Sequence, residues 1–349
     1  MAVLSSAEEH LPQEWHLKGF RKGKMDGLPK VVCVTNGTSY LGLWIAINLL
    51  RRGYMVRLTV DTTEELEKLM EMEEFARYRN SVVGVVGNIT AEDPDSLSEK
   101  FDGCYGVFHT SSFIDPLSVS GFTEHMVNLE VQGAEKVVEA CSLASSVRRL
   151  VFTSSLAACI WHSRVIESDI RVDEKCWSDP SLCRERKLWF AQAKTMAEKA
   201  AWRVARERGG LVMVSMCPAF LTGPAFSSSN STSSIAYFKG AKEMFEKKVL
   251  ATVDVQKAAE AHVCVYQEMG EGGASGRYIC FDKLIKTPTD ALHLEEKLKF
   301  NMGFSQGFED NDSIENGRFV IGTDRVVNAK LGRVMAKWCL QSNSALGIM

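Results

Sequence analysis

Long apolar runs are missing from this sequence. Nowhere in its 349 residues is there a run close to the ~18 consecutive apolar residues that a membrane-spanning helix needs. Residues 1–26 are polar and charged and lack the apolar segment of a secretory signal peptide. We therefore expect a cytoplasmic protein that makes no contact with membranes.

An excess of charge of one sign is also missing. The 41 Lys and Arg residues nearly balance the 44 Asp and Glu residues, and the net charge is −3. A chain so close to neutral has no global attraction to nucleic acid or to an acidic membrane surface. We therefore expect neither nucleic acid nor a membrane as its partner. The sequence does not fix its oligomeric state.

Clusters of metal-ligating residues are absent as well. The ten cysteines are scattered, and Cys176 and Cys183 have no group of histidines near them. We expect no metal site, and a loop thiol is the simpler interpretation of these two cysteines. Without a signal peptide the cysteines are expected to be reduced thiols, several of them buried in strands, such as Cys33 and Cys280.

What the chain does contain is a regular alternation of strand-like and helix-like segments. Lys30–Thr35 is a short apolar run typical of a strand buried on both faces, and Tyr40–Arg52 is an apolar helix that ends at Gly53. Further strands are predicted at Tyr54–Val60, Ser81–Val86, Gly106–His109, Arg149–Thr153 and Leu211–Met216, and helices at 62–79, Val119–Ala144 and Arg184–Arg208. This alternation predicts an α/β fold with a Rossmann-type doubly wound parallel sheet.

The pattern changes after residue 224. A cluster of serine, asparagine and threonine at Ser227–Ser234 is either a substrate lid or a mobile loop. Beyond it we predict a basic helix at Tyr237–Lys248, a strand at Leu250–Val253, a helix at Val255–Met269, a strand at Gly276–Cys280 and an amphipathic helix at Thr323–Cys339. We divide the chain into a polar, partly disordered leader (1–28), a Rossmann domain (29–224) and a smaller substrate lobe (225–349), some of whose elements return to the Rossmann domain.

The junction of the first strand and the first helix has the context of a dinucleotide-binding turn. A tight turn after a buried strand lets backbone N–H groups and the dipole of the next helix meet a pyrophosphate. The alternative is a strand–helix junction that binds no nucleotide. The candidate cofactor-binding residues are Asn36, Gly37, Thr38, Ser39, Tyr40, Leu41 and Gly42.

An acidic residue, Asp61, follows the second predicted strand. A carboxylate at this place can accept a hydrogen bond from the 2′-hydroxyl of an adenosine ribose, and it would repel the 2′-phosphate of NADP. If the turn binds a cofactor, Asp61 therefore favours NADH. The alternative is a solvated residue that starts the turn into the next helix.

A serine, a phenylalanine and a lysine have the spacing of a carbonyl-reducing site. Phe190 and Lys194 are four residues apart on one predicted helix, so their side chains point to the same side. Ser155 follows the fifth predicted strand, at the strand end where ligands gather in parallel sheets. Reduction of a carbonyl group also needs a proton donor near the oxygen, and the phenylalanine at position 190 has no proton to give.

The chain resembles the plant cinnamoyl-CoA reductase and dihydroflavonol reductase branch of the extended short-chain dehydrogenases/reductases, over about residues 30–285. The resemblance implies NAD(P)H-dependent reduction of a phenylpropanoid-type carbonyl compound or CoA ester. It is carried by Val32–Thr35, Gly53–Arg57, Gly106–His109, Arg149–Ser155, Lys194–Trp202, Pro218–Pro224, Ala259–His262 and Gly276–Tyr278.

The resemblance also implies roles for single residues. Ser155 and Lys194 match the catalytic serine and lysine of the family, and Phe190 stands at the tyrosine position without a gap. Beyond the turn, the cofactor-binding positions that it implies are Asn88, Ile89, Thr110, Ser112, Thr153, Lys194, Pro218, Ala219 and Phe220.

Several of these positions depart from the family pattern. The family has glycines where this chain has Asn36 and Ser39, and an arginine for the NADP 2′-phosphate where it has Asp61. Cinnamoyl-CoA reductases have Asn-Trp-Tyr-Cys-Tyr-Gly-Lys around the tyrosine, of which only the tryptophan and the final lysine remain. Two hypotheses follow: a reductase with weakened or redirected catalysis, and a pseudoenzyme that keeps the fold for binding or regulation. A third, weaker hypothesis is an NAD(H) sensor without turnover.

Overall fold

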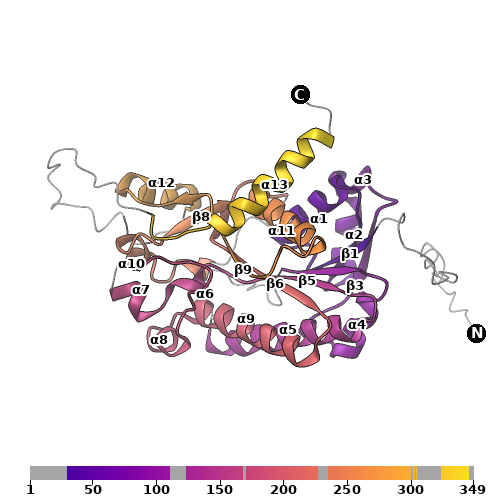
Figure 1. The fold of residues 1–349 in the computed structure, drawn as a ribbon, viewed down its shortest axis with the longest axis horizontal. Helices are drawn as coiled ribbons and strands as arrows, with labels where there is room; N and C mark the ends of the chain where they lie inside the picture. The colour runs from indigo at the N-terminus through magenta and orange to yellow at the C-terminus, as the bar shows by residue number, and fades with distance from the viewer. Residues whose placement is uncertain are drawn as a thin grey trace, which may run out of the picture.

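Seven parallel strands form the central sheet, in the order β3-β2-β1-β4-β5-β6-β9 (Figure 1). The computed structural model describes residues 30–110, 123–167, 170–226, 235–299, 302, 304 and 324–345. The two series of strands run outward from β1 and β4, which confirms the predicted doubly wound α/β fold. The strands are β1 (Val31–Thr35), β2 (Met55–Val60), β3 (Val82–Val86), β4 (Gly106–His109), β5 (Arg149–Thr153), β6 (Val212–Pro218) and β9 (Gly276–Cys280).

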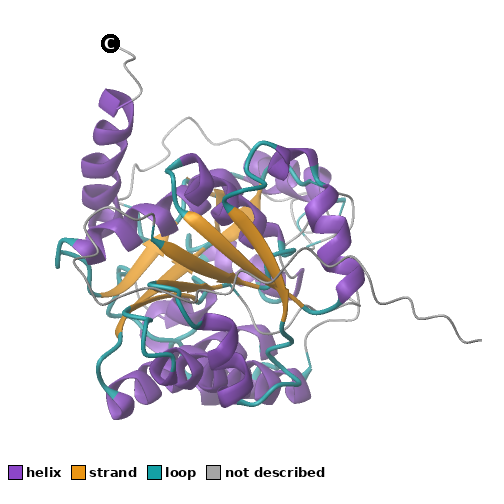
Figure 2. Cartoon of the chain, turned by 90° about the vertical axis from the view of Figure 1, so that its right-hand side faces the viewer, coloured by secondary structure: helices purple, strands orange, loops and turns teal. Residues whose placement is uncertain are grey.

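Helices cover both faces of this sheet. Figure 1 shows α4, α5 and α9 on one face and α1, α11 and α13 on the other, and Figure 2 shows the strands between the two helix layers. No helix in the described ranges has the length and apolar character needed to cross a bilayer. The helices are α1 (Tyr40–Arg51), α2 (Thr63–Glu71), α3 (Glu73–Ala76), α4 (Pro94–Phe101), α5 (Glu124–Leu143), α6 (Ala157–Ile160), α7 (Ser163–Glu167), α8 (Pro180–Glu185), α9 (Trp189–Arg208), α10 (Ala241–Glu246), α11 (Val255–Gly270), α12 (Pro288–Leu298) and α13 (Ala329–Ala345), with a 3₁₀ helix η2 (Ile235–Phe238).

The first strand and helix are apolar because both lie inside the molecule. Val32, Cys33 and Val34 of β1 are fully buried, as expected for a central strand of a sheet covered on both faces. Helix α1 is buried on nearly all sides because it packs against both the sheet and the neighbouring helix α11. This burial fixes the start of α1 at the end of β1, where the predicted dinucleotide turn lies.

The predicted continuous helix Arg184–Arg208 is wrong, because the chain forms two helices there. Lys187 takes a left-handed conformation, with φ +54°, which ends the short helix α8 before α9 begins at Trp189. The break places Phe190 and Lys194 in the first two turns of α9. The predicted helix Tyr237–Lys248 is likewise divided, into η2 and α10, at Gly240 with φ +87°.

A smaller sheet, β10-β8-β7, lies beside the main one and is formed by β7 (Phe220–Thr222), β8 (Ala251–Asp254) and β10 (Lys283–Leu284). Its first strand precedes residue 225, while β9 and α11 follow that residue and pack with the Rossmann elements. The predicted leader and the Ser227–Ser234 cluster fall on residues outside the described ranges.

Helix α12 was not among the predicted elements, although its start carries a recognisable signal. The Thr287 hydroxyl caps the helix by accepting a hydrogen bond from the Asp290 amide, and Pro288 stands at the first helical position.

Candidate active site

The carboxyl ends of four neighbouring strands bring most of the predicted site residues to one edge of the sheet. Thr35 ends β1, His109 ends β4, Thr153 ends β5 and Pro218 ends β6. Thr35 and His109 are paired residues of adjacent strands, and the strand series diverge between β1 and β4. Ligands of open α/β sheets bind at such a switch point, outside the carboxyl ends of the strands.

The turn after β1 begins with a residue in the left-handed conformation and approaches β2 closely. Asn36 adopts φ +51°, which confirms that asparagine can make the turn here. The amide of Gly37 donates to the carbonyl oxygen of Thr59 at 2.7 Å. A Cβ atom at Gly37 would lie only 2.7 Å from the Cβ of Leu58 on β2, so the close approach of the two strands requires glycine.

Ser39 is the N-cap of α1, and its hydroxyl already satisfies one of the amides that a phosphate would need. The Ser39 Oγ accepts a hydrogen bond from the Gly42 amide at 3.1 Å and lies 3.3 Å from the Thr110 hydroxyl. A Cβ at Gly42 would lie 2.6 Å from that Oγ and 2.7 Å from the Asn36 carbonyl oxygen. The turn therefore fits a pyrophosphate in shape, with Ser39 as an internal competitor for the helix N-terminus.

The other turn residues contribute backbone rather than side chains. The side chains of Tyr40 and Leu41 are buried in the core, and burial raises the pKa of the Tyr40 hydroxyl well above its usual value. Thr38 is half-buried at the start of the helix. Only backbone N–H groups are thus available to an anion from positions 40 and 41.

At the end of β2, Asp61 is exposed beside a second carboxylate. Its amide donates to the Glu65 Oε2 at 3.0 Å. Partial desolvation and, after it, the Glu65 charge raise the pKa of Asp61 above its ordinary value. Two neighbouring carboxylates at this strand end make an unfavourable place for a 2′-phosphate.

The two residues predicted to contact adenine follow β3, and their side chains already make contacts within the protein. The Asn88 Oδ1 accepts from the Thr90 amide at 3.0 Å and the Ala91 amide at 2.9 Å, so this side chain stabilises its own turn. Ile89 is buried in the core between the sheet and α5. Ser112 lies outside the described residues.

Ser155 is buried at the end of β5 and its hydroxyl is oriented by the backbone. The Ser155 Oγ accepts a hydrogen bond from the Ala157 amide at 3.2 Å. This bond occupies a lone pair and leaves the hydroxyl proton to donate. Its neighbour Thr153 is fixed differently, with its hydroxyl 3.1 Å from the His262 Nε2.

Phe190 and Lys194 lie together on α9, as their spacing predicts. The Lys194 Nζ is 5.9 Å from the centre of the Phe190 ring. The ring of Tyr237 meets that of Phe190 edge to face at 6.2 Å. Phe190 is half-buried and carries no titratable group, so position 190 supplies an apolar ring and no proton donor.

The ammonium of Lys194 is paired with a buried carboxylate, Glu130 on α5. The Nζ–Oε1 distance is 2.5 Å, and the two side chains are 9% and 4% exposed. The Lys194 charge also reaches the end of β4, because burial and then this ammonium lower the pKa of His109 to about 3. His109 is therefore neutral, and its Nδ1 lies 2.9 Å from the Thr35 hydroxyl.

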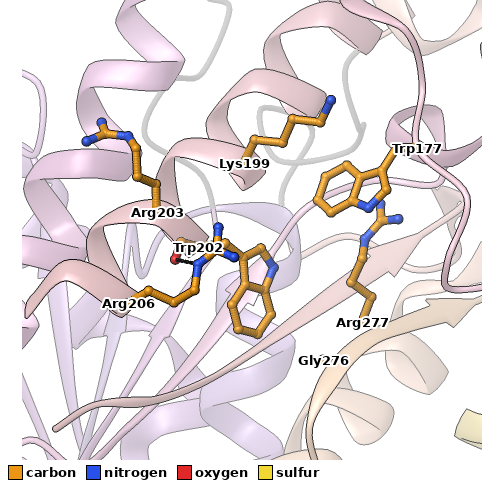
Figure 3. Close-up of a pocket in the computed structure, with 7 residues that line it drawn as sticks. All are labelled: Trp177, Lys199, Trp202, Arg203, Arg206, Gly276 and Arg277. Atoms are coloured by element: carbon orange, nitrogen blue, oxygen red, sulfur yellow. Dashed lines mark hydrogen bonds between the residues drawn. The ribbon is translucent and has the colours of Figure 1, made fainter. Parts of the chain in front are cut away.

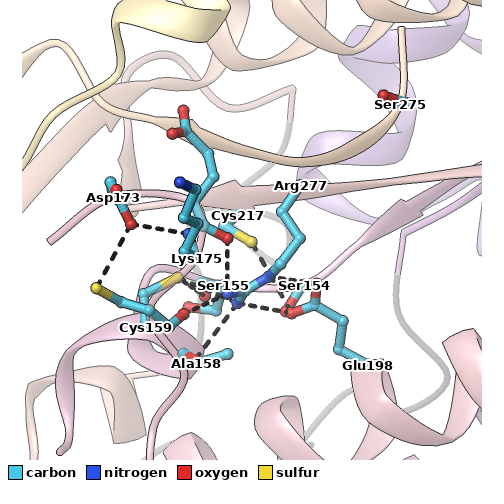
Figure 4. Close-up of polar contacts among 12 residues, drawn as sticks. Ser154, Ser155, Ala158, Cys159, Asp173, Lys175, Glu198, Cys217, Ser275 and Arg277 are labelled. Carbon is cyan, nitrogen blue, oxygen red and sulfur yellow. Dashed lines mark hydrogen bonds and ion pairs between the residues drawn. The ribbon is translucent and has the colours of Figure 1, made fainter.

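A second buried pair lies directly behind the site (Figure 4). Glu198, one turn beyond Lys194, accepts from the Ser154 hydroxyl at 2.6 Å and from the Arg277 Nε at 2.7 Å. Arg277 also donates to the carbonyl oxygen of Cys176. This network joins β5, α9 and β9, and so fixes the strand end that carries Ser155.

The segment after β6 is packed rather than open. The Pro218 carbonyl oxygen accepts from the Leu156 amide, and Ala219 donates to the Cys280 carbonyl oxygen, each at 2.8 Å. Phe220 is buried against Phe238, with ring centres 4.2 Å apart. These contacts set the backbone path beside Ser155.

A cavity of about 620 Å³ lies elsewhere, at the outer strand β9 (Figure 3). Gly276 is the first residue of β9, and Arg277 joins the cavity wall to the Glu198 network, but none of the predicted site residues lines the cavity. No group of three or more potential metal ligands occurs in the described part of the chain. The residues that line the cavity are Trp177, Lys199, Trp202, Arg203, Arg206, Gly276 and Arg277.

Two buried carboxylates, Glu130 and Glu198, were missed by sequence reasoning. Each interrupts an otherwise apolar or small-residue stripe: Glu130 follows Val127 by three positions and precedes Ala134 by four. Glu198 follows Lys194 by four and lies on the buried side of α9. A charged residue at a stripe position is the signal that could have found them.

The chain is similar to known reductases over most of its length. A family model described as the 3-beta hydroxysteroid dehydrogenase/isomerase family matches residues 33–291. Cinnamoyl-CoA reductase 1 from Petunia hybrida is 34% identical over 73% of this chain and 74% of its own length.

Solved reductase structures share the fold. Vestitone reductase from alfalfa (Medicago sativa L.) is 24% identical, with a TM-score of 0.61 over 87% of this chain and 91% of its own. Yeast methylglyoxal/isovaleraldehyde reductase complexed with NADPH is 18% identical, with a TM-score of 0.61 over 88% of this chain and 93% of its own.

Proposed function

Because the chain belongs to the 3-beta hydroxysteroid dehydrogenase/isomerase family, we propose that it is an NAD(P)H-dependent reductase of a small carbonyl compound. One observation carries the proposal. Ser155, Lys194 and the N-terminus of α1 occupy neighbouring strand and helix ends at the switch point of the sheet. The fold class alone would host many activities, but this combination of side chains serves carbonyl chemistry.

The described residues fit a nicotinamide dinucleotide at the turn after β1. The amides at the start of α1 and the close approach at Gly37 and Gly42 would hold the pyrophosphate. Thr110 and Lys194 would hold the nicotinamide ribose. When bound, the cofactor supplies a hydride to the carbonyl carbon.

Within this function each side chain has a limited role. Ser155 donates a hydrogen bond from its hydroxyl group to the carbonyl oxygen, keeps its own proton, and stabilises the negative charge that develops on that oxygen. Phe190 excludes water from the reacting carbon but gives no proton. The alkoxide must therefore take its proton from the Lys194 ammonium or from water. Loss of a positioned general acid typically costs about 10²–10⁴ in rate, so we expect slow turnover.

The cofactor preference that we propose is NADH. Asp61 stands at the strand end that meets the adenosine ribose in this fold, and Glu65 adds a second carboxylate beside it. Both would repel a 2′-phosphate. The yeast relative is complexed with NADPH, so this preference would be a departure within the fold.

The substrate class that we propose is a phenylpropanoid-type aldehyde, ketone or CoA ester. The names of similar proteins include a cinnamoyl-CoA reductase and a vestitone reductase. The half-buried rings of Trp189 and Phe190 at the start of α9 suit a flat aromatic substrate.

The test is a calorimetric titration of the protein with NADH and with NADPH. Micromolar binding of either, with NADH tighter, is the expected result. Binding of neither at millimolar concentration would end the reductase proposal and leave the non-catalytic binding alternative. Binding without turnover of any aromatic aldehyde or CoA thioester would instead indicate a dinucleotide-binding pseudoenzyme.

A further inference from the structure

The ion pair between Lys194 and Glu130 differs from the other ion pairs that join α5 to α9. Arg203 and Glu135 form one such pair at the surface, where their side chains are 52% and 34% exposed. Lys194 and Glu130 are almost fully buried at 2.5 Å. Exposed pairs contribute little to stability, whereas a buried carboxylate requires its partner. Glu130 therefore depends on the lysine that the active site also needs.

This pairing places a negative charge in contact with the ammonium that Lys194 brings to the site. The two charges offset each other at points equally near to both, although the ammonium still lowers the pKa of His109. An ammonium near an acid lowers the pKa of that acid, because it stabilises the conjugate base. A carboxylate 2.5 Å from the same ammonium offsets this effect at position 190, because the ammonium itself is 5.9 Å from the centre of the Phe190 ring and the two opposite charges are much closer to each other. It also engages part of the hydrogen-bonding capacity with which the ammonium could bind ribose hydroxyls.

We propose that Glu130 is a positioning residue that holds the Lys194 ammonium and neutralises it, so that the site binds dinucleotide weakly and cannot acidify a group at position 190. The inference deepens the proposed function and rests on it where dinucleotide binding is concerned. It identifies Glu130 as a second residue, beside Phe190, that weakens this site.

Among the described residues, the titratable groups near position 190 include this pair and two others. The titratable groups that the described elements bring near the Phe190 ring, directly or through Lys194, are Lys194, Glu130, His109 and Tyr237. His109 is neutral above pH 3, and burial raises the pKa of Tyr237 far above its usual value. The balance between Lys194 and Glu130 thus sets the field at this position.

A tyrosine introduced at position 190 can report that field without any cofactor. The variants are Phe190→Tyr and the double variant Phe190→Tyr/Glu130→Gln, each titrated by ultraviolet absorbance against the parent that lacks the new tyrosine. Glutamine keeps the size of Glu130 and an acceptor oxygen, so Lys194 stays in place. We expect the single variant to titrate near the usual tyrosine pKa of about 10, and the double variant about one pKa unit or more lower.

The matched control is Glu135→Gln, which removes the exposed α5–α9 pair. It should leave the pKa of the introduced tyrosine unchanged. In dinucleotide titrations, Glu130→Gln should bind NADH about tenfold more tightly than the wild type, as expected for one charge-assisted hydrogen bond gained, and Glu135→Gln should not.

An equal tyrosine pKa in the single and double variants would overturn the role of Glu130. So would a dinucleotide affinity that Glu130→Gln and Glu135→Gln change equally. If no variant, wild type included, binds NADH or NADPH, the proposed function fails, while the tyrosine titration still decides whether Glu130 neutralises Lys194.

Discussion

The candidate dinucleotide turn and helix α9 are the two places where the resemblance predicts departures from the family pattern, and we expect these departures to have different consequences. At the turn, Asn36 takes a left-handed conformation of the kind that glycine adopts readily, with φ +51°. On α9, Phe190 lies beside Lys194 but has no proton to give. We therefore expect a substitution to cost little where backbone groups bind the ligand, and to cost more where a single hydroxyl group would be the proton donor.

The same contrast appears in the two buried carboxylates beside the site. Glu198 is shared by Ser154 and Arg277, and it serves to hold strand ends together. Glu130 is paired with Lys194, a residue of the candidate site itself. One carboxylate supports the scaffold, and the other acts on the chemistry. If the turn still binds a dinucleotide and Phe190 on α9 limits turnover, variants at the turn should change binding and variants at position 190 should change the rate.

The largest effect is expected from Phe190→Tyr. The new hydroxyl lies four residues before Lys194 on the same helix face and restores a positioned proton donor. We expect kcat to rise about 10²-fold, at the lower end of the usual range for a general acid because Glu130 still neutralises Lys194. Steady-state turnover of aromatic aldehydes with NADH measures this.

Phe190→Leu serves as its control, since it changes the ring without adding a hydroxyl and should give no gain. The claim that this site lacks only a proton donor fails if the Phe190→Tyr variant binds dinucleotide normally and still shows no rise in turnover. The site would then lack more than the proton donor, as expected of a pseudoenzyme.

The next effect is a loss, from Gly42→Ala at the turn. The added methyl group would meet the Ser39 Oγ and the Asn36 carbonyl oxygen at 2.6 and 2.7 Å. Overpacking of this kind typically costs about 1–3 kcal/mol. We expect lower thermal stability and at least about tenfold weaker dinucleotide binding, measured by thermal unfolding and calorimetry.

Gly332→Ala is the matched control for Gly42→Ala, because that helical glycine of α13 has open space around it. It should leave both stability and binding unchanged or slightly raise stability. Equal behaviour of the two variants would show that the turn does not depend on close packing at Gly42.

The elements formed by local patterns were predicted well from the sequence. The buried strand β1, the apolar helix α1 and the end of that helix before Gly53 follow from periodicity and from a glycine with φ +79°. The spacing of Phe190 and Lys194 also predicted that their side chains share one face of a helix. These features depend on residues close together in the chain.

Features that depend on distant residues could not be predicted. The partner of Lys194 is Glu130, 64 positions away, and only the packing of α5 on α9 brings them together. The break at Lys187 has no glycine or proline to mark it, since a lysine takes the left-handed conformation. The resemblance marked Ser39 as a departure from a family glycine, but it could not predict that the Ser39 hydroxyl accepts a hydrogen bond from the Gly42 amide.

A smaller effect is expected from Ser39→Gly, which should let the turn bind a phosphate group more tightly. Removal of the hydroxyl frees the Gly42 amide for a phosphate oxygen, while glycine at an N-cap costs only a few tenths of a kcal/mol relative to serine. We expect dinucleotide affinity to rise by roughly three- to tenfold. Ser39→Thr keeps the hydroxyl and should bind like the wild type. If both variants bind alike, Ser39 does not compete with the phosphate.

The smallest effect is expected at the end of β2, from Asp61→Asn. The variant removes one of two neighbouring carboxylates and leaves Glu65 in place, so the repulsion of a 2′-phosphate is reduced rather than abolished. Because Asp61 is exposed, salt screens its charge, and we expect only about a threefold shift of the NADPH-to-NADH affinity ratio, larger at low ionic strength.

Glu67→Gln, which removes an exposed carboxylate on α2, is the control for a general charge effect. An equal shift in both variants would mean that Asp61 acts through net charge and does not face the ribose. A shift confined to Asp61→Asn, and lost at high salt, would show that the turn still orients a dinucleotide in the usual direction across the sheet.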